Sequence, residues 1–434
     1  MQIKHGQLPG LWIARQTTNV LFDVTLTWLL EHFGPAAAQS IAVSSCVLIF
    51  TWGTFAFCCA VSGRRPWFVM PMLMMLAYGY VFQMGFFNFY LSLGLCFFWL
   101  AIFWNGHSWR PALSLPLLVL AWLAHPLPVL WVAGIALYVI GFRRLEPSHR
   151  IFALAVCLLL LVLARELALR YSQGVWFPFQ FFTTTGADQV FVFDSKYAVI
   201  LGGLALLWAI LLRDLRRHDI GHSAPASLLT HLVVLNALGF LILPERMRYG
   251  PGHGVVYISE RMSLATGVFV LALLAMGLVR RWHVVLAAAL AVLFFSFLYV
   301  DDRNSNRAED RLQAAVAQLP PRQRVIMAPI SRPGRVDLEA HQLDRACIGH
   351  CFSYANAEPA TLAFRVRTSE NNPFIIGSYL ESTRLQLGKY RVRPQDLPLY
   401  EITPCGAGQK DYCARSVQAG EIVREYTLDG NTNH

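Results

Sequence analysis

Long apolar stretches separated by short loops fill the chain up to Val300, and the residues after it are mainly polar. A helix needs about 20 predominantly apolar residues to cross the hydrocarbon layer of a bilayer, and most of these stretches approach that length. The pattern therefore predicts about ten membrane-spanning helices. Their expected ranges are 39–61, 67–83, 85–104, 111–125, 127–142, 151–169, 197–212, 226–243, 262–279 and 283–300.

Two boundaries between these predicted spans depend on a few residues. The apolar run 67–104 is too long for one span and is interrupted between Gln83 and Asn88, which predicts a helical hairpin. The next run is cut at Pro126 and Pro128, because proline lacks the backbone donor that would continue a helix.

The composition indicates that lipid is the main solvent of this chain. Hydrophobic residues make up 56% of it, charged residues only 14%, and there are 12 tryptophans. A water-soluble protein with this composition would have too few polar side chains to cover its surface.

The lysines and arginines define an expected topology. Short loops rich in these residues stay in the cytoplasm. In this chain every second loop carries a cluster of them, and the loops in between mostly do not. We accept this alternation although the 244–261 loop, which it places outside, carries three arginines. The net charge of +10 is then mainly a topology signal, and no nucleic-acid partner is needed to explain it. The expected inner loops contain Arg64, Arg65, Arg110, Arg143, Arg144, Arg150, Arg213, Arg216, Arg217, Arg280 and Arg281.

The expected organisation has three parts. Residues 1–38 form an external segment in which Thr18–His32 has the pattern of an interfacial amphipathic helix. No apolar stretch precedes this segment, so either the following helix translocates it or an upstream helix is missing. Residues 39–300 form the transmembrane helical domain, and residues 301–434 form a periplasmic domain. The fold class is an all-α polytopic membrane protein with a small α+β C-terminal extracytoplasmic domain, in the inner membrane of a bacterium.

The cysteines agree with this topology. Four of the nine lie in the C-terminal domain, at positions 347, 351, 405 and 413. An even number of cysteines in an oxidising compartment predicts two disulfides among Cys347, Cys351, Cys405 and Cys413, with the pairing left open. A zinc site is the alternative, but the spacings differ from the usual two-residue knuckle.

Candidate catalytic residues lie before the first span and at the predicted break at residue 125. Asp23 and Glu31 are the only carboxylates before the first span, and a carboxylate at a membrane surface is able to act as a general base. The solvated face of a surface helix is the alternative. His125 lies at the expected outer end of its helix, where it is either a catalyst or a capping residue.

Candidate substrate-binding residues lie on two outer segments. The hairpin tip offers amide and phenol groups from Gln83, Asn88 and Tyr90, although aromatic residues are enriched at that depth in any case. The 170–195 loop is dense in aromatic residues and contains Asp188, so it either presents a carboxylate beside a lipid tail or is a connector resting on the membrane.

The 244–261 loop is the third candidate segment. An arginine fork is a natural partner for a lipid phosphate or pyrophosphate. A structural set of salt bridges with Glu245 is the alternative. The candidate substrate-binding residues of this loop are Arg246, Arg248, His253, Glu260 and Arg261.

Polar residues also gather around one cysteine pair of the C-terminal domain. His341, Asp344, His350 and Glu358 surround Cys347 and Cys351 in sequence. They are able to bind a divalent cation or an acceptor, but exposed polar residues near a disulfide are the commoner situation. We assign no metal ligands.

The architecture as a whole resembles the GT-C superfamily of polytopic membrane glycosyltransferases, which use polyprenyl-phosphate-linked sugars. The segment Gly85–Gly94 is also similar to uncharacterised bacterial multi-pass proteins of this general type. The resemblance implies inverting transfer of a sugar from a polyprenyl-phosphate lipid to an external acceptor, which an acid of the first external loop activates. In that family the acid follows closely after a first span, which is absent before His5–Gly10. Asp23 is the available substitute.

Two alternatives remain open at this point. A lipid or solute transporter or flippase would require polar groups lining a path through the membrane, and the spans contain few, chiefly His231 and Asn236. A non-catalytic assembly protein would use its external domain to bind a partner protein.

Overall fold

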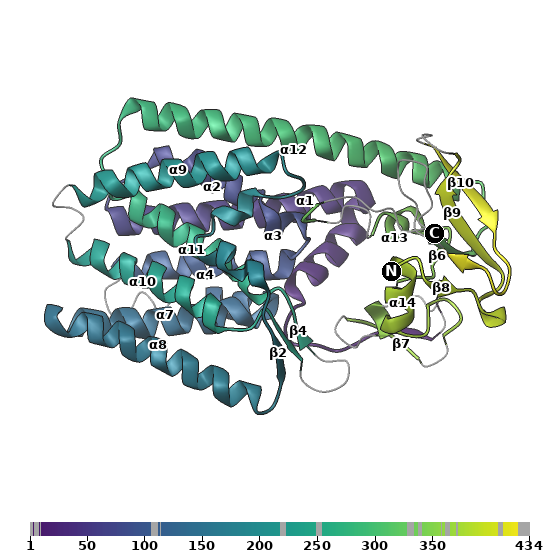
Figure 1. Cartoon of the computed structure of the whole chain (residues 1–434), viewed down its shortest axis with the longest axis horizontal. Coiled ribbons are helices and arrows are strands. Elements are labelled where there is room, and N and C mark those ends of the chain that lie inside the picture. The colour runs from purple at the N-terminus through teal and green to yellow at the C-terminus, as the bar shows by residue number, and fades with distance from the viewer. Residues whose placement is uncertain are drawn as a thin grey trace. The chain divides into compact units, whose positions relative to one another are not determined.

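A computed structural model shows the arrangement of the chain (Figure 1). It describes residues 10–105, 114–217, 223–248, 254–327, 334–336, 341–356, 358–360, 365–369, 372–406 and 411–423, together with Ile3, Leu8 and Ala112. The chain forms two compact units. The helical unit comprises Gln16–Ser296, and the C-terminal unit comprises Phe297–His434 with Met1–Arg15.

The first helix contains the first predicted span and the predicted amphipathic segment from Leu21 onward. Helix α1 runs from Leu21 to Ser62 and is interrupted at Gly34, whose φ of 77° and ψ of 169° are not helical. A left-handed φ is available to glycine at little cost, so the break occurs where the sequence supplies one. The apolar part after the break, Ala37–Ser62, is long enough to cross a membrane.

Seven helices of the described residues are long and apolar enough to span a bilayer, and the chain is a multi-pass membrane protein. Each coincides with a predicted span. They are Ala37–Ser62 of α1, α4 (Phe87–Asn105), α7 (Pro126–Arg144), α8 (Pro147–Leu169), α9 (Tyr197–Arg216), α10 (Ala224–Ile242) and α12 (Arg281–Val316).

The structure does not show ten spans, because three of the predicted ones are shorter helices. The first is divided into η1 (Trp67–Val69), α2 (Met70–Ala77) and α3 (Tyr80–Gln83). The other two are α6 (Leu115–Ala124) and α11 (Ile258–Leu274). With a rise of about 1.5 Å per residue, a helix of 17 residues is about 25 Å long, which is less than the hydrocarbon thickness of about 30 Å.

Helix α11 is enclosed by protein along its whole length. All of its residues except Glu260 are buried. Just after its C-terminal end, Arg64 donates from Nη2 to the backbone oxygens of Ala275, at 3.0 Å, and Gly277. A positive charge at this end also interacts favourably with the helix dipole.

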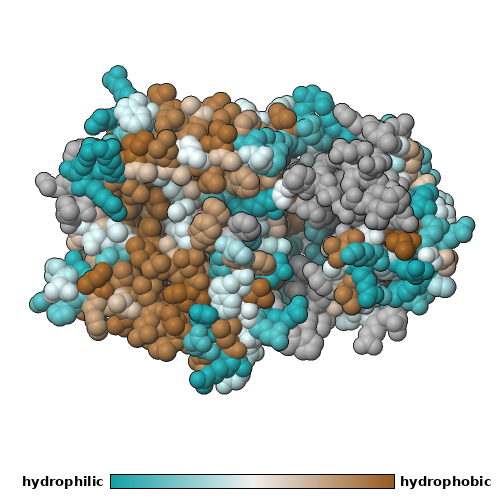
Figure 2. All heavy atoms as spheres, in the orientation of Figure 1, coloured by the Kyte–Doolittle hydropathy of each residue, from teal (hydrophilic) through white to brown (hydrophobic). Residues whose placement is uncertain are grey.

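Lipid-facing apolar residues lie on the outer helices. On the face that Figure 2 shows, hydrophobic residues gather over the helical unit, and hydrophilic residues lie toward the helix ends. Helix α8 has only 6% of its most apolar window buried, and Ile151 and Phe152 are among its exposed side chains. Such a helix is stable only where lipid or another apolar surface covers it.

The loops at the end of the helical unit where α11 begins carry a small antiparallel sheet. Strand β3 (Arg246–Arg248) lies between β2 (Gln173–Val175) and β4 (Gly254–Val255). Two 3₁₀ helices, η2 (Pro178–Thr184) and η3 (Ala187–Val190), follow β2. The 170–195 and 244–261 loops, two separate candidate segments in the sequence, are therefore joined by backbone hydrogen bonds.

The C-terminal unit is a mixed α+β structure, as predicted. Its four-stranded sheet has the order β10-β9-β5-β6, with β5 parallel to both neighbours and β10 antiparallel to β9. These strands are β5 (Arg324–Met327), β6 (Phe352–Ser353), β9 (Leu399–Pro404) and β10 (Tyr412–Ser416). The helices α13 (Gln342–Ala346) and α14 (Tyr379–Gln386) and the 3₁₀ helices η5 (Glu358–Ala360) and η6 (Pro394–Asp396) complete the described helical elements.

Two further strand pairs belong to this unit. Strand β1 (Leu11–Ile13) pairs antiparallel with β7 (Val366–Thr368), so the start of the chain joins its C-terminal part. Strand β8 (Tyr390–Arg391) pairs antiparallel with β11 (Ile422–Val423).

The two predicted disulfides are confirmed, and both are local. Cys347 is bonded to Cys351 and Cys405 to Cys413. The first links the end of α13 to the residue before β6, and the second joins the ends of the β9–β10 hairpin. Disulfides fit an oxidising compartment, so the C-terminal unit is consistent with an extracytoplasmic location.

Candidate functional site

A buried polar cluster lies at the N-terminal end of α11. Its residues come from three segments that are far apart in the sequence: the start of α3, the 3₁₀ helix η3, and the 245–263 region. We call these residues the α11 cluster: Tyr80, Asp188, Gln189, Glu245, Ser259, Glu260, Arg261 and Ser263.

Gln189 joins the three segments of the α11 cluster. Its side chain is fully buried. Its Oε1 accepts a hydrogen bond from the backbone N–H of Val81 at 3.2 Å. Its Nε2 donates to the backbone oxygen of Glu260 at 2.9 Å and to Oγ of Ser263 at 2.6 Å. The buried amide is thus satisfied on both sides, as a buried polar group must be if it is not to destabilise the fold.

Glycines allow η3 to approach α2, α3 and α11 this closely. A Cβ at Gly79 would lie 2.6 Å from the carbonyl oxygen of Gln189, and a Cβ at Gly186 would overlap the backbone of Gly267. Gly186 also has a φ of 77°, which other residues rarely adopt. The loop that carries Asp188 is therefore inserted between helices.

The carboxylates of the α11 cluster bind hydroxyl groups. Oε2 of Glu245 accepts hydrogen bonds from Ser259, from its backbone N–H at 3.0 Å and from its Oγ. Glu260 accepts one from the hydroxyl of Tyr80 at 3.2 Å. Oδ2 of Asp188 accepts one from Ser263 at 3.2 Å. The site therefore holds three acidic side chains around the positive end of a helix dipole.

Glu245 has the properties of a proton-exchanging group at neutral pH. Its side chain is 3% exposed. Burial raises the pKa of Glu245 to about 7, against the lowering effect of the hydrogen bonds from Ser259. Its other oxygen, Oε1, is buried and has no hydrogen-bond partner among the described residues. Such a carboxyl group changes its charge near pH 7.

Arg261 is the buried cation of the cluster. Its side chain is 7% exposed, and its guanidinium donates to the backbone oxygens of Tyr257 at 3.0 Å and Val256 at 2.6 Å. The same group lies over the rings of Phe86 and Phe89, at 5.1 and 5.5 Å from their centroids. Carbonyl dipoles and ring faces thus replace the water that would solvate this charge. Arg261 fixes the hairpin tip to the start of α11.

Arg246 and Arg248, in contrast, are exposed at the two ends of β3. The Arg246 guanidinium lies over the rings of Phe177 and Tyr257, at 5.0 and 5.8 Å. Close by in the chain, Phe181 and Phe182 of η2 are exposed. Cationic and apolar groups are therefore presented together on the loops. His253, the remaining candidate of this loop, lies outside the described residues.

The candidates of the first segment lie in α1. Asp23 is half-buried in the first turn of the helix, and Glu31 is exposed one turn before the break. Asn88 fixes this end of the helix, because its Oδ1 accepts a hydrogen bond from the backbone N–H of Phe22 at 2.9 Å. Phe22 also stacks on Phe87, with ring centroids 4.9 Å apart. The start of α1 is therefore held against the hairpin tip. The Asn88 side chain satisfies a backbone N–H of the first turn, as a helix-capping side chain does.

The other candidates of the hairpin and the 125 break make structural contacts. Gln83 donates to the backbone oxygen of Tyr78 at 3.4 Å. Tyr90 is fully buried, and its hydroxyl donates to the oxygen of Ala77 at 2.8 Å. His125 is the N-cap of α7, since its Nδ1 accepts a hydrogen bond from the backbone N–H of Leu127 at 3.2 Å. Their roles in binding or catalysis stay predictions.

The polar residues around the first disulfide form pairs. Nδ1 of His341 lies 2.8 Å from Asp344, and its Nε2 lies 3.9 Å from Glu358. His350 contacts the backbone oxygen of Leu319 at 2.9 Å. Within the described part of the chain, no group of three or more acidic, histidine or cysteine side chains is placed to hold a metal ion.

The two polar residues of the spans selected from the sequence, His231 and Asn236, each contact a side chain of a neighbouring helix. His231 of α10 contacts the hydroxyl of Tyr138 of α7 at 2.7 Å. Asn236 of α10 accepts a hydrogen bond from the indole N–H of Trp131 of α7 at 2.7 Å. Pairs of this kind join helices in a membrane.

Comparison with known proteins adds no relative: the chain matches no protein-family model, no curated protein and no solved structure. Any functional assignment therefore depends on the residues themselves. Sequence reasoning selected Asp188, Glu260 and Arg261 but missed Tyr80 and Gln189. The sequence signal that could have indicated Gln189 is its place next to Asp188, in a loop where Gly186 permits a close approach to a helix.

Proposed function

We propose that this chain is an inverting glycosyltransferase of the GT-C type, which transfers a sugar from a polyprenyl-phosphate-linked donor to an acceptor outside the cytoplasmic membrane. One observation supports this proposal most. Acidic and cationic side chains from the outer segments selected in the sequence gather at one end of the helical unit, beside exposed aromatic residues. Lipid-phosphate donors are amphiphilic and need both kinds of surface.

In this proposal the exposed arginines bind the lipid phosphate. A guanidinium fork matches the oxygens of a phosphate, and both Arg246 and Arg248 are exposed residues. The exposed rings of Phe177, Phe181 and Phe182 would contact the first isoprene units. Arg261 has a different role, because its charge is used to hold Phe86 and Phe89 beside α11.

The transfer step needs a base that takes the proton of the acceptor hydroxyl. Asp23 is the proposed base, as the acid in the first external segment. Glu245 is the alternative within the α11 cluster, because its raised pKa suits proton exchange at neutral pH. As the acceptor oxygen bonds to the anomeric carbon, the bond from that carbon to the phosphate oxygen breaks, and the polyprenyl phosphate leaves with both electrons.

Binding of a polyprenyl phosphate is the direct test of the lipid site. The full chain would be placed in nanodiscs of phosphatidylcholine and titrated with fluorescent undecaprenyl phosphate. We expect Arg246→Gln/Arg248→Gln to weaken binding by about tenfold or more, since two charge-assisted contacts are removed. The matched control, Arg216→Gln/Arg217→Gln, removes two exposed charges from the end of α9 and is expected to leave binding unchanged.

Turnover is the test of the transfer. Loss of undecaprenyl-phosphate hexose, supplied as a panel of sugars with a bacterial envelope extract as acceptor source, would be followed by mass spectrometry. Asp23→Asn and Glu245→Gln would be compared, and the variant that binds donor normally but does not consume it identifies the base. Absence of donor binding by the wild-type chain would refute the proposal and would favour a non-catalytic assembly protein.

A further inference from the structure

A basic hollow lies on the C-terminal unit, within a single group of its elements. Its volume is about 600 Å³, and it is formed by the end of α14, the strand β8, the start of η6 and the turn before β11. Four basic side chains and one carboxylate line it: Arg384, Lys389, Arg391, Arg393 and Glu381. The volume falls within the range of small-molecule sites.

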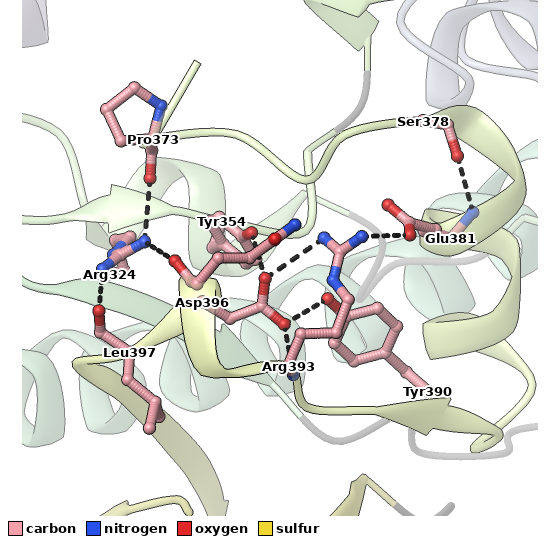
Figure 3. A network of polar contacts seen from close by, with 10 residues as sticks. Arg324, Tyr354, Pro373, Ser378, Glu381, Tyr390, Arg393, Asp396 and Leu397 are labelled. Atoms are coloured by element: carbon pink, nitrogen blue, oxygen red, sulfur yellow. Dashed lines mark hydrogen bonds and ion pairs between the residues drawn. The ribbon is translucent and has the colours of Figure 1, made fainter. Parts of the chain in front are cut away.

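The four cations of this hollow are of two kinds. Arg393 is held by Glu381 and by Asp396, which lies 3.1 Å from its Nη2 (Figure 3). The side chains of Arg384, Lys389 and Arg391 are exposed, and none makes an ion pair or a side-chain hydrogen bond within the described residues. Three positive charges are thus left available beside one that is already neutralised.

The backbone around the hollow is well fixed. Lys389 donates from its N–H to the oxygen of Arg384 at 2.8 Å, which closes the end of α14. Strand β8 pairs with β11 through Arg391 and Ile422, and Gly420 donates to the oxygen of Val392 at 2.8 Å. The three cations are therefore attached to a backbone that is fixed by hydrogen bonds.

The wall and floor of the hollow restrict the choice of ligand. Tyr390 is buried, and its hydroxyl donates to Asp396 at 2.6 Å, so its ring forms an apolar wall without a free donor. The free donors are two guanidinium forks and one ammonium group. Guanidinium forks match tetrahedral oxyanions in geometry, and a charge of about −2 matches three nearby cations better than a single carboxylate does.

We propose that the hollow between α14, β8 and the turn before β11 binds a phosphate monoester, carried either by a saccharide or by a lipid head group, through Arg384, Lys389 and Arg391. The site is separate from the α11 cluster and does not depend on the proposed transferase activity. Arg393 has a positioning role, since it fixes the backbone from β8 to η6.

The test is isothermal titration calorimetry on the full chain in phosphatidylcholine nanodiscs. The ligands are glucose 1-phosphate and, in a separate titration, inorganic pyrophosphate. The variant Arg384→Gln/Lys389→Gln/Arg391→Gln is expected to weaken binding by at least about tenfold. The matched control is Arg303→Gln/Arg307→Gln/Arg322→Gln, which removes the same charge from exposed positions of the same unit and is expected to bind as the wild type does. Arg384→Lys/Arg391→Lys keeps the charge and is expected to give an intermediate affinity.

The outcomes distinguish the two carriers. If phosphatidic acid in the nanodisc abolishes the binding of glucose 1-phosphate to the wild-type chain, and the same amount of phosphatidylglycerol, which carries a phosphodiester, does not, the carrier is a lipid. If phosphatidic acid has no effect, the carrier is a saccharide. Equal weakening in the triple variant and in the control would show general charge attraction and overturn the proposal, as would absence of binding by the wild type.

Discussion

Replacement of Asp396 is expected to open part of the C-terminal unit. Its side chain is fully buried and accepts four hydrogen bonds. Two come from the hydroxyls of Tyr354 at 2.7 Å and Tyr390 at 2.6 Å. The other two come from Arg393, from its backbone N–H at 2.7 Å and from its guanidinium at 3.1 Å (Figure 3). Asp396→Asn keeps the shape but replaces one oxygen by an NH₂ group.

The magnitude follows from the bonds that this change removes. The two donors that face Oδ2 would meet another donor, and the charge of Arg393 would keep only Glu381 as a partner. A hydrogen bond to a charged group contributes about 1.5–3 kcal/mol, and removal of one member of a buried ion pair costs about 3–5 kcal/mol. We therefore expect a loss of about 4 kcal/mol in the local opening free energy, which is a factor of about 1,000 in the opening equilibrium.

Hydrogen exchange by mass spectrometry on the full chain in nanodiscs measures this opening. The informative amides are those of Val392 and Val417, which donate to Glu421 and Leu399. Glu421→Gln is the control, because this carboxylate binds the exposed Arg415 on the surface of the same unit. Peptides of the helical unit are an internal reference and are expected to exchange as in the wild type.

The dependence on pH gives a second check. Burial alone would raise the pKa of Asp396, but the hydrogen bonds from Tyr390, Arg393 and Tyr354 outweigh it and lower that pKa below its ordinary value. A depressed pKa means that the stabilisation is complete above the unfolded-state pKa of about 3.9 and is lost as the pH falls through the folded-state pKa. The difference between wild type and Asp396→Asn must shrink in acid. Exchange within tenfold of wild type at pH 7 would refute the reasoning.

Three further outcomes are expected. Burial raises the pKa of Glu245 to about 7, so the folded chain holds this proton more tightly than the unfolded chain does. The wild type should therefore lose about 3 kcal/mol of stability relative to Glu245→Gln as the pH rises from about 4.3 to 7. Thermal unfolding in nanodiscs at both pH values measures this loss. Asn88→Ala removes the acceptor of the Phe22 N–H and should destabilise the start of α1 by about 1 kcal/mol, seen as faster amide exchange confined to its first turn. Reduction of the Cys405–Cys413 bond should destabilise the β9–β10 hairpin by about 2 kcal/mol, because the closed loop is short, and should leave exchange in the spans unchanged.

Hydropathy predicts helices well where lipid surrounds them and less well where other parts of the protein surround them. The seven candidate spans coincide with predicted stretches because each is apolar over a membrane thickness. Helix α11 was predicted four residues too late, at 262 rather than Ile258, because a charged pair, Glu260 and Arg261, was assigned to the loop. In the structure Arg261 is buried, since carbonyl oxygens and aromatic rings take the place of water. A hydropathy window does not record such partners.

The α11 cluster shows the same limit for the candidate site. Asp188 and Glu260 were selected because charged residues on outer loops are conspicuous in an apolar sequence. Gln189 was not selected, although its four hydrogen bonds fix the geometry of both. Its importance comes from the approach of η3 to α3 and α11, which is a tertiary property permitted by Gly79 and Gly186.

For the disulfides, the sequence predicts that the cysteines are oxidised, and the tertiary structure determines which cysteines pair. The even number of cysteines outside the spans predicted oxidation, but three pairings were equally compatible with the sequence. The β9–β10 hairpin decides between them, because Cys413 faces Thr403 across the ladder and Cys405 follows that strand by one residue. Hairpin register thus selects the Cys405–Cys413 pair and leaves Cys347 with Cys351. In this chain the composition predicts which solvent surrounds each part, and the pairing of particular residues follows only from the packing of distant segments.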